Sequence, residues 1–223
     1  ATALRVLTDS DGTATFRILE PMSDADRRAV RQLIDDVSAE IRTMAEPDQP
    51  ERLRAPAVRL LGVIGAAGDQ PLVIGALDAE DEMVRESAAV ALGHFSANET
   101  VVSALLGQLD DSFFAVRVAA AQSLGMLIGE DTPRAGDVTD ALVVMLDDDF
   151  KTVRAASAHA LATIASERAL QVIDSRIDEM EPAVKIAALR GLVESQASGA
   201  APILERFVEH RDVRFRRAAR GEL

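Results

Sequence analysis

The most informative absences in this 223-residue chain are those of cysteine, tryptophan and tyrosine. Without cysteine the chain has no disulfide framework, no thiol nucleophile and no thiolate metal site. Aromatic residues make up only 3% of the chain although 48% of its residues are hydrophobic. Alanine, leucine and valine must therefore fill the core, and such small aliphatic residues suit closely stacked helices.

Positive charge is also scarce, since the formal net charge is −13 and only Lys151 and Lys185 are lysines. Nucleic acid and anionic lipid would repel the chain as a whole, because it has no surplus of cations to release condensed counterions. No apolar run is long enough to span a bilayer, and Ala1–Asp9 lacks the regions of a signal peptide. We therefore expect a soluble, cytoplasmic protein that binds neither nucleic acid nor membrane.

A segment of about ten residues recurs along the chain. Each copy has an aliphatic residue and then a cation. In the first five copies a small residue follows three positions after the cation, and a leucine follows seven positions after it. The cations are Arg54, Arg85, Arg117, Arg154, Lys185 and Arg214, separated by 31, 32, 37, 31 and 29 residues. Because these offsets fall on one face of a helix, each copy predicts a helix that approaches its neighbours closely.

A second apolar stretch, which ends in an acidic turn in most copies, comes before each later copy. These stretches cover residues 72–81, 102–111, 141–149, 170–179 and 202–210. One unit is therefore an A helix, a turn, a short B helix and a second turn. A single helix pair cannot bury its own apolar face, so it needs neighbours on both sides.

This pattern resembles the HEAT repeat family, and in particular the short HEAT-like repeats of phycobilisome lyases. The Asp turns, the Val-Arg start and the Ala-x-x-x-Leu-Gly motif carry the resemblance over about residues 47–223. It implies an all-α solenoid of about five helix pairs. Most members of the family are adaptors or scaffolds, which implies a protein partner. In this family the repeated cations usually bond successive repeats together, and we expect that role here in preference to anion binding.

Residues 1–46 differ from the array and form a separate N-terminal region in the predicted organisation. Two β-prone runs flank Asp9–Gly12, and an Asp-Gly pair between such runs predicts a β-hairpin. The hairpin either caps the first helix pair or pairs with another chain. A long capping helix is predicted from Ser23 to about Met44, and two prolines at 47 and 50 then interrupt the chain before the array.

Two irregularities interrupt the later repeats. The third repeat is six residues longer than the common spacing, and the extra length falls in Gly129–Gly136. Such an insertion either reaches a partner or is only a tolerated loop. The last copy is a half repeat rich in arginine, which either associates with another helix or ends the array as a solvated cap.

No pattern of catalytic or metal-binding residues stands out. His94, His159 and His210 lie in different repeats without metal-ligand spacing, and no His-Glu dipeptide of the related iron-dependent hydroxylases occurs. Phosphate-binding glycine loops and the Gly-x-Ser-x-Gly elbow are missing as well. We therefore expect no enzyme activity, no cofactor and no metal.

HEAT arrays generally bind partners along the face lined by their B helices. The residues one position before the last apolar residue of each B helix form a first stripe, which includes Gln108, Met145, Arg176 and Phe207. The residues three positions before that apolar residue form a second stripe, which becomes acidic at Asp174 and Glu205. A groove of this kind would suit an amphipathic segment with a basic half, unless the second stripe is half core and its polarity is chance.

Aromatic residues form a second candidate surface. Phe113, Phe114 and Phe150 lie in the turns that enter two adjacent A helices. Phe113 and Phe150 both stand four residues before the cation, where other repeats have acids. If exposed they would form a binding hot spot, and if tucked between repeats they would be core.

The sequence thus predicts a non-catalytic adaptor or scaffold that binds another protein through the B-helix face or the inter-repeat turns. Association through the N-terminal hairpin or the C-terminal half repeat is a further route to a partner. The alternative, which the resemblance implies, is a non-catalytic or chromophore-handling subunit of a bilin-lyase-like assembly.

Overall fold

The computed structural model describes residues 4–8, 14–18, 24–129, 132 and 134–222, and its side chains are described at residue 32 and from residue 34. The chain forms two compact units, Ala1–Val101 and Val102–Leu223, and each is described by itself. The division of the sequence into 1–46 and 47–223 stays a prediction.

The first unit begins with strands β1 (Leu4–Thr8) and β2 (Ala14–Ile18), which pair antiparallel. The turn predicted at residues 9–12 lies outside the described residues, as does Ser23, where the long helix is predicted to begin. The hairpin and its role therefore stay predictions. The helices of this unit are α1 (Asp24–Ala45), α2 (Glu51–Ile64), α3 (Gln70–Gly75) and α4 (Glu82–Leu92), with 3₁₀ turns at Ala67–Asp69 and Ala76–Asp78.

Helix α1 packs against α2 at the start of the repeats. Arg42, in its last turn, donates from Nε to Oδ1 of Asp69 at 2.5 Å and from a second nitrogen to Oδ2 at 3.2 Å. Asp69 is buried, so this paired guanidinium satisfies a carboxylate that would otherwise be costly inside the protein. The long helix that the sequence predicts to about Met44 thus ends at a fixed contact.

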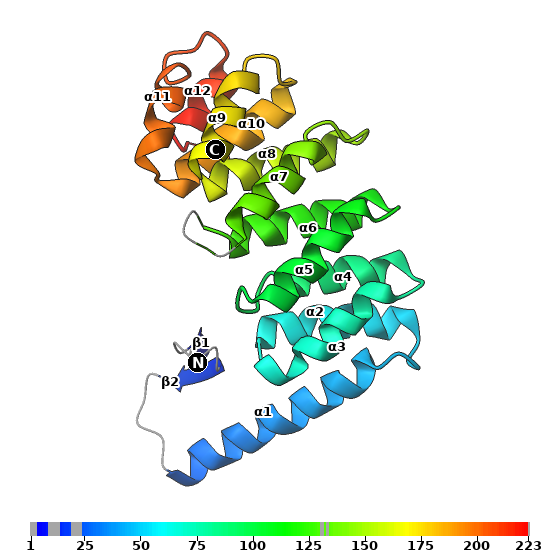
Figure 1. The fold of residues 1–223 in the computed structure, drawn as a ribbon. Coiled ribbons are helices and arrows are strands. Elements are labelled where there is room, and N and C mark those ends of the chain that lie inside the picture. The colour runs from blue at the N-terminus through cyan, green and yellow to red at the C-terminus, as the bar shows by residue number, and fades with distance from the viewer. Residues whose placement is uncertain (1–3, 9–13, 19–23, 130–131, 133, 223) are drawn as a thin grey trace. The chain divides into compact units, whose positions relative to one another are not determined.

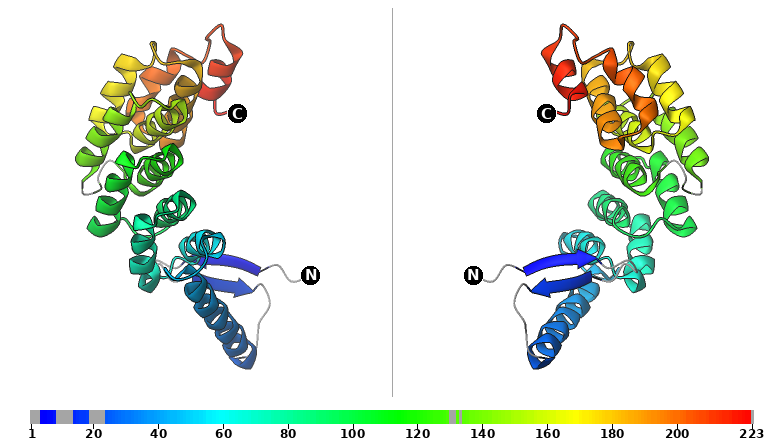
Figure 2. Two further views of the ribbon diagram at one scale, coloured as in Figure 1. Left: turned by 90° about the vertical axis from the view of Figure 1, so that its right-hand side faces the viewer. Right: turned by 90° about the vertical axis from the view of Figure 1, so that its left-hand side faces the viewer.

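Helix α5 (Glu99–Gly107) contains the boundary between the units. The second unit then contains α6 (Phe114–Leu127), α7 (Ala135–Met145), α8 (Lys151–Ile164), α9 (Glu167–Arg176), α10 (Pro182–Ser195), α11 (Ala201–Glu205) and α12 (Val213–Ala219), with 3₁₀ turns at Gln108–Asp110 and Ser198–Ala200. The A helices are α2, α4, α6, α8 and α10, and the B helices are α3, α5, α7, α9 and α11. Figure 2 shows the second unit as two layers, with α6, α8 and α10 in one and α7 and α9 in the other.

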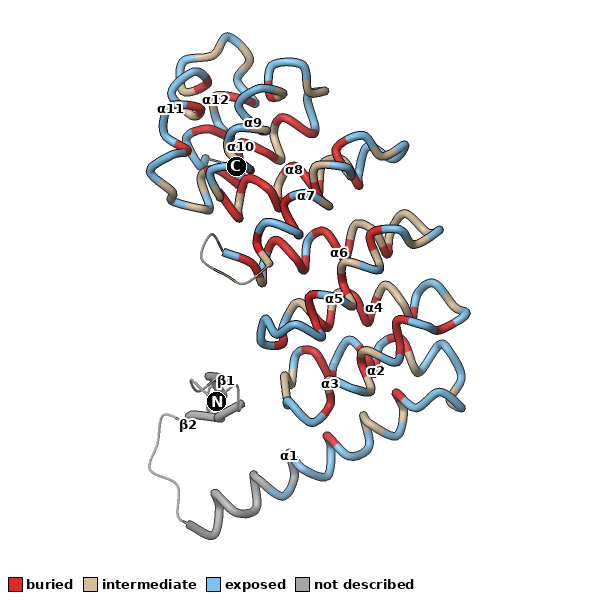
Figure 3. The backbone as a smooth tube through the Cα atoms, in the orientation of Figure 1, coloured by how far each residue is buried: buried red, intermediate tan, exposed pale blue. Residues whose placement is uncertain are grey.

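The motif residues form the core that the repeat predicts. Buried positions follow the A helices in Figure 3. The small residues three positions after each cation are buried, and so are the leucines seven positions after it, which are Leu61, Leu92, Leu124, Leu161 and Leu192. One face of each A helix is therefore buried, and α2 packs against α4, α6 against α8 and α8 against α10, as the offsets predict.

Three glycines let neighbouring A helices approach more closely than any other residue would permit. A Cβ atom on Gly62 would lie 2.5 Å from Cα of Ala91, one on Gly125 would lie 2.8 Å from Cα of Ala160, and one on Gly191 would clash with the carbonyl oxygen of His159. Gly62 and Gly125 directly follow the motif leucine, and at both places the glycine marks a contact between helices and not the end of a helix.

The repeated cations connect successive turns. Arg117 donates to the carbonyl of Asp111 in its own turn at 2.7 Å and, from Nε, to Oδ2 of Asp148 in the next turn at 2.8 Å. Arg154 makes the same pair of contacts, to the carbonyl of Asp148 at 2.6 Å and to Oε1 of Glu181 at 3.0 Å. The predicted structural role of the cations is therefore confirmed in these repeats.

The last copy of the motif begins two residues later than the sequence pattern places it. In three earlier repeats the cation, which is Arg85, Arg117 or Arg154, donates to the carbonyl six residues before it. In the last copy Arg216 does so, to His210 at 2.7 Å. Arg214, the cation chosen from the sequence, instead pairs with Asp212 beside it. The placement at Arg214 was wrong.

Packing explains the choice between the two arginines. Phe215 fills the buried place that valine takes in earlier repeats, while Val213 is exposed. Both residues are apolar and both precede an arginine, so the sequence pattern fits either register. In the corrected register the last spacing, from Lys185 to Arg216, is 31 residues, which equals the commonest spacing.

The close approach at Gly125 gives a first prediction. Gly125→Val should lower the free energy of unfolding by about 1–3 kcal/mol, because the side chain would force α6 and α8 apart. Gly136→Ala is the matched control, since a Cβ there has no heavy atom within 4 Å and alanine favours the helix. Urea denaturation followed by circular dichroism measures both. Equal losses in the two variants would contradict the packing role of Gly125.

Candidate binding surfaces

The three phenylalanines at the turns form one stack of rings. Phe114 lies parallel to Phe150, with ring centroids 4.8 Å apart and an interplanar angle of 9°. The Phe113 ring contacts the Phe114 ring in a tilted arrangement, with ring centroids 5.3 Å apart. Phe113 and Phe114 are half-buried, whereas Phe150 keeps 47% of its surface exposed. The predicted aromatic surface is thus partly tucked between repeats and partly open to solvent.

A buried ion pair lies beneath this stack. Arg117 binds both carboxylate oxygens of Asp148, at 2.8 and 3.1 Å, and the two side chains are only 12% and 8% exposed. Asp148 also accepts from the amide of Phe150 at 2.8 Å. Burial acts to raise the pKa of Asp148, but these hydrogen bonds and the charges of Arg117 and Arg154 outweigh it, so the pKa is lowered.

Two polar members of the B-helix stripes, Asp174 and Arg176, take part in ion pairs between successive B helices and their turns. Asp174 in α9 accepts from Arg206 at 2.6 Å, and Arg176 pairs with Asp147. In the same way Arg168 binds Asp140 at 2.5 Å. The change to an acid at Asp174 thus has a structural reason, because the Asp174 carboxylate pairs with Arg206 of the next repeat.

The remaining stripe residues differ in accessibility. Glu205 is exposed, and Met145 and Gln108 are half-buried. The side-chain oxygen of Gln108 is buried and has no hydrogen-bond partner among the described residues. Phe207 is only 2% exposed and packs edge-on against Phe215 with ring centroids 6.4 Å apart. Phe207 therefore offers no surface to a partner in this structure, because its ring fills the core of the last repeat.

One hollow in the second unit lies on A helices. This A-face pocket has a volume of about 640 Å³ and crosses α6, α8 and α10. Its lining is Val118, Gln122, Gly125, Met126, Thr152, Ala155, Ala156, His159, Thr163, Ala187, Arg190 and Glu194. His159 Nε2 lies 3.0 Å from Glu194 Oε2, so a close polar contact joins α8 to α10 at the pocket. The volume falls within the usual range of ligand pockets.

The sequence contains a signal for this pocket that the B-helix expectation overlooks. The positions five and nine residues after the cation change in chemistry from repeat to repeat, while the core positions do not. Five residues after it stand Arg59, Val90, Gln122, His159 and Arg190, and nine residues after it stand Val63, His94, Met126, Thr163 and Glu194. The last three of each set line the pocket. Variable positions on one face of a repeat protein indicate a surface that is free to recognise a partner.

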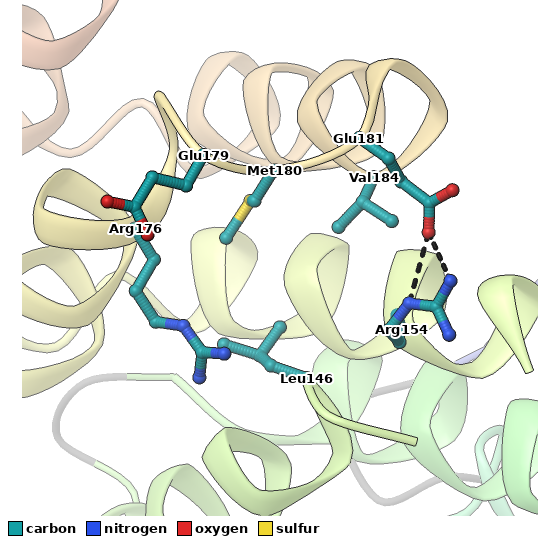
Figure 4. Close-up of a pocket in the computed structure, with 7 residues that line it drawn as sticks. All are labelled: Leu146, Arg154, Arg176, Glu179, Met180, Glu181 and Val184. Carbon is teal, nitrogen blue, oxygen red and sulfur yellow. Dashed lines mark hydrogen bonds and ion pairs between the residues drawn. The ribbon is translucent and has the colours of Figure 1, made fainter. Parts of the chain in front are cut away.

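A smaller hollow of about 240 Å³ lies where the turn before α10 meets the preceding repeat. Figure 4 shows Arg154 and Arg176 on opposite sides of it, with Met180 and Val184 projecting between them toward Leu146. Both arginines already have carboxylate partners, in Glu181 and Asp147. This hollow is therefore a gap between repeats that are joined by ion pairs, and its arginines are not available to bind an anion.

Other kinds of site receive no support from the geometry. Among the described residues, no three His, Cys, Asp or Glu side chains gather as the ligands of a metal would. Nor does any helix in the described part of the chain have the length and apolar character needed to cross a bilayer.

Similar proteins share this architecture. The model of a family described as HEAT repeats matches residues 38–125 and 102–179. No curated protein sequence is a match. The solved complex of CpcE and CpcF of phycocyanin lyase from Nostoc sp. PCC7120 is 25% identical, with a TM-score of 0.63 over 83% of this chain and 75% of that chain. The YibA protein of E. coli is 16% identical, with a TM-score of 0.59 over 90% of this chain and 74% of its own.

A designed protein gives a third comparison. A designed armadillo repeat protein in complex with the peptide (KR)4 is 19% identical, with a TM-score of 0.52 over 82% of this chain and 98% of that chain. At this identity the likeness concerns the fold.

The buried pair beneath the rings should matter far more than the exposed pairs of the B helices. Asp148→Ala should lower the free energy of unfolding by about 3–5 kcal/mol, because it leaves Arg117 buried without its partner. Asp174→Ala, which breaks the exposed pair with Arg206, should cost at most about 1 kcal/mol. Urea denaturation at pH 7 compares them, and similar losses would refute the ranking.

The same comparison has a pH dependence. The pKa of Asp148 in the folded protein lies below its ordinary value of 3.8. Its contribution to stability is thus fully present above that value and is lost as the pH falls through the folded pKa. The difference between wild type and Asp148→Ala should therefore shrink in acid. A difference that is constant from pH 7 to pH 2 would contradict the lowered pKa.

Proposed function

The chain belongs to the HEAT repeat family, and from this membership we propose that it is a non-catalytic adaptor that binds a segment of a partner protein in the A-face pocket. The observation that carries the proposal is a pocket of about 640 Å³ across three A helices, lined at the positions that vary between repeats. This surface takes the place of the B-helix face as the main candidate.

The chemistry of the pocket suits an amphipathic segment. Small apolar residues, among them Ala155, Ala156 and Ala187, line the pocket and leave room for larger apolar side chains of a partner. Polar groups that include Gln122 and Arg190 can bind the polar side of the same segment. Recognition of an amphipathic helix in an apolar groove follows this division.

Filling the pocket should therefore abolish partner binding. Ala155→Arg should reduce the recovery of partners from native lysate by about tenfold or more, since a large charged side chain would occupy the pocket lining. Val144→Arg is the matched control, because Val144 is apolar, lies on B helix α7 and is 64% exposed. Circular dichroism checks that both variants are folded. Equal recovery with both variants would refute the A-face pocket as the partner site.

A second candidate function follows from the similarity to the CpcE and CpcF complex. In this alternative the chain is a subunit of a lyase-like assembly that pairs with a second subunit and handles a bilin chromophore. The identity of 25% over 83% of the chain supports it, and the pocket would then hold the other subunit or the chromophore.

Absorbance spectroscopy separates the two functions. An adaptor should leave the visible spectrum of added bilin unchanged, both alone and with a candidate second subunit encoded beside it. A saturable shift of the bilin band that Ala155→Arg removes would instead favour the lyase-like subunit. Serum albumin, which binds apolar pigments without specificity, sets the background of the measurement.

A further inference from the structure

We propose that the ring stack of Phe113, Phe114 and Phe150 is a docking surface for an arginine-bearing basic segment of a partner protein. The inference rests on the proposed function, because it adds a second surface to the adaptor and names the chemistry that this surface binds. It concerns the turns that begin α6 and α8, and it uses no residue of the A-face pocket.

Two repeats place rings where other repeats have an acid. The position four residues before the cation begins each A helix, and in the corrected register it carries Asp81, Glu181 and Asp212 in three repeats. Asp81 accepts two amide hydrogen bonds at the start of α4 and Asp212 accepts one at the start of α12, whereas Glu181 pairs with Arg154. Phe113 and Phe150 replace the acid, and α6 and α8 have no side-chain cap. The two phenylalanines therefore give up the capping bond or the ion pair that an acid makes at this position.

Stacking within the fold recovers only part of this loss. The Phe114 ring stacks on the Phe150 ring, which is a favourable contact beyond the area that it buries. Yet Phe150 keeps 47% of its surface exposed, and this part of the residue adds nothing to the core. A local rule that is broken without full compensation is typical of a functional position.

The surroundings of the rings favour a cation. Arg117 already lies with Cζ 5.5 Å from the centroid of Phe150, so this ring accepts a guanidinium group. Asp148 neutralises Arg117, which removes the repulsion that a second cation would meet. Asp110 and Asp149, in the two turns that carry the rings, are exposed and make no ion pair among the described residues.

Arginine fits this surface better than the other candidates. Its planar guanidinium can stack on the exposed part of an aromatic ring and bind a carboxylate at the same time, which the ammonium of lysine does less well. An acidic segment would be repelled by Asp110 and Asp149. A purely apolar segment would cover these carboxylates without giving them a partner. The surface therefore selects a basic segment, and arginine within it.

Fluorescence anisotropy with two labelled peptides tests the proposal on the full chain. An octapeptide of arginine should bind about two- to fivefold more tightly than an octapeptide of lysine, the factor that an exposed cation–π contact provides. Phe150→Leu keeps an apolar side chain without a ring face, and it should bring the two affinities together. Phe150→Tyr should retain the preference. Asp149→Asn should weaken both peptides, and more strongly at low salt.

The controls separate this proposal from the proposed function. Val144→Ala removes exposed apolar surface elsewhere in the same unit and should change neither affinity. Ala155→Arg, which blocks the A-face pocket, should not weaken either peptide. Equal binding of the two peptides by wild type, or an arginine preference that survives Phe150→Leu, would overturn the proposal. Neither result bears on partner recovery through the pocket.

Discussion

The close approach of neighbouring A helices is the constraint on which the rest of the structure depends. It is possible only because small residues stand where one helix faces the next, and at Gly62, Gly125 and Gly191 only glycine leaves enough room. Once α6, α8 and α10 lie side by side, their leucines fill the space between the layers. The turns are brought together at one end, where a single guanidinium can reach the turns of two repeats. The ion pairs, the stack of rings and the pocket all follow from this spacing.

The sequence predicts this core well because each core position repeats. Leu124 and Leu161 were placed correctly without knowledge of the fold, since the same offset from a cation recurs in five copies. The structural role of Arg117 followed from the Asp turns in the same way. Because the pattern recurs, it removes the ambiguity that a single helix would leave. The order of the A and B helices can therefore be predicted from the sequence.

Single features without a repeat were harder to predict. The register of the last copy depends on whether Val213 or Phe215 is buried, and only the packed helix decides this. The alignment of the B helices predicts Phe207 as part of a surface stripe, because the same position carries residues as different as Gln108 and Arg176 in other repeats. The A-face pocket was missed for a related reason: its residues share no chemistry, and a search for conserved patterns within the chain passes over positions that vary. The proximity of the three phenylalanine rings, by contrast, follows from the equal offsets of Phe113 and Phe150.

The one lysine among the repeated cations has a consequence for how the array unfolds. Arg117 and Arg154 each span two turns with a forked group, whereas Lys185 has one amine, which donates to the carbonyl of Asp178 at 3.0 Å. A chain of repeats behaves as a row of coupled units, in which each boundary has its own coupling strength. The boundary after α10 relies on packing of Lys185 against the rings of Phe207 and Phe215 in place of a second ionic tie. The cooperativity of the array is therefore uneven, with a boundary at this point that can open before the remaining repeats of the second unit melt.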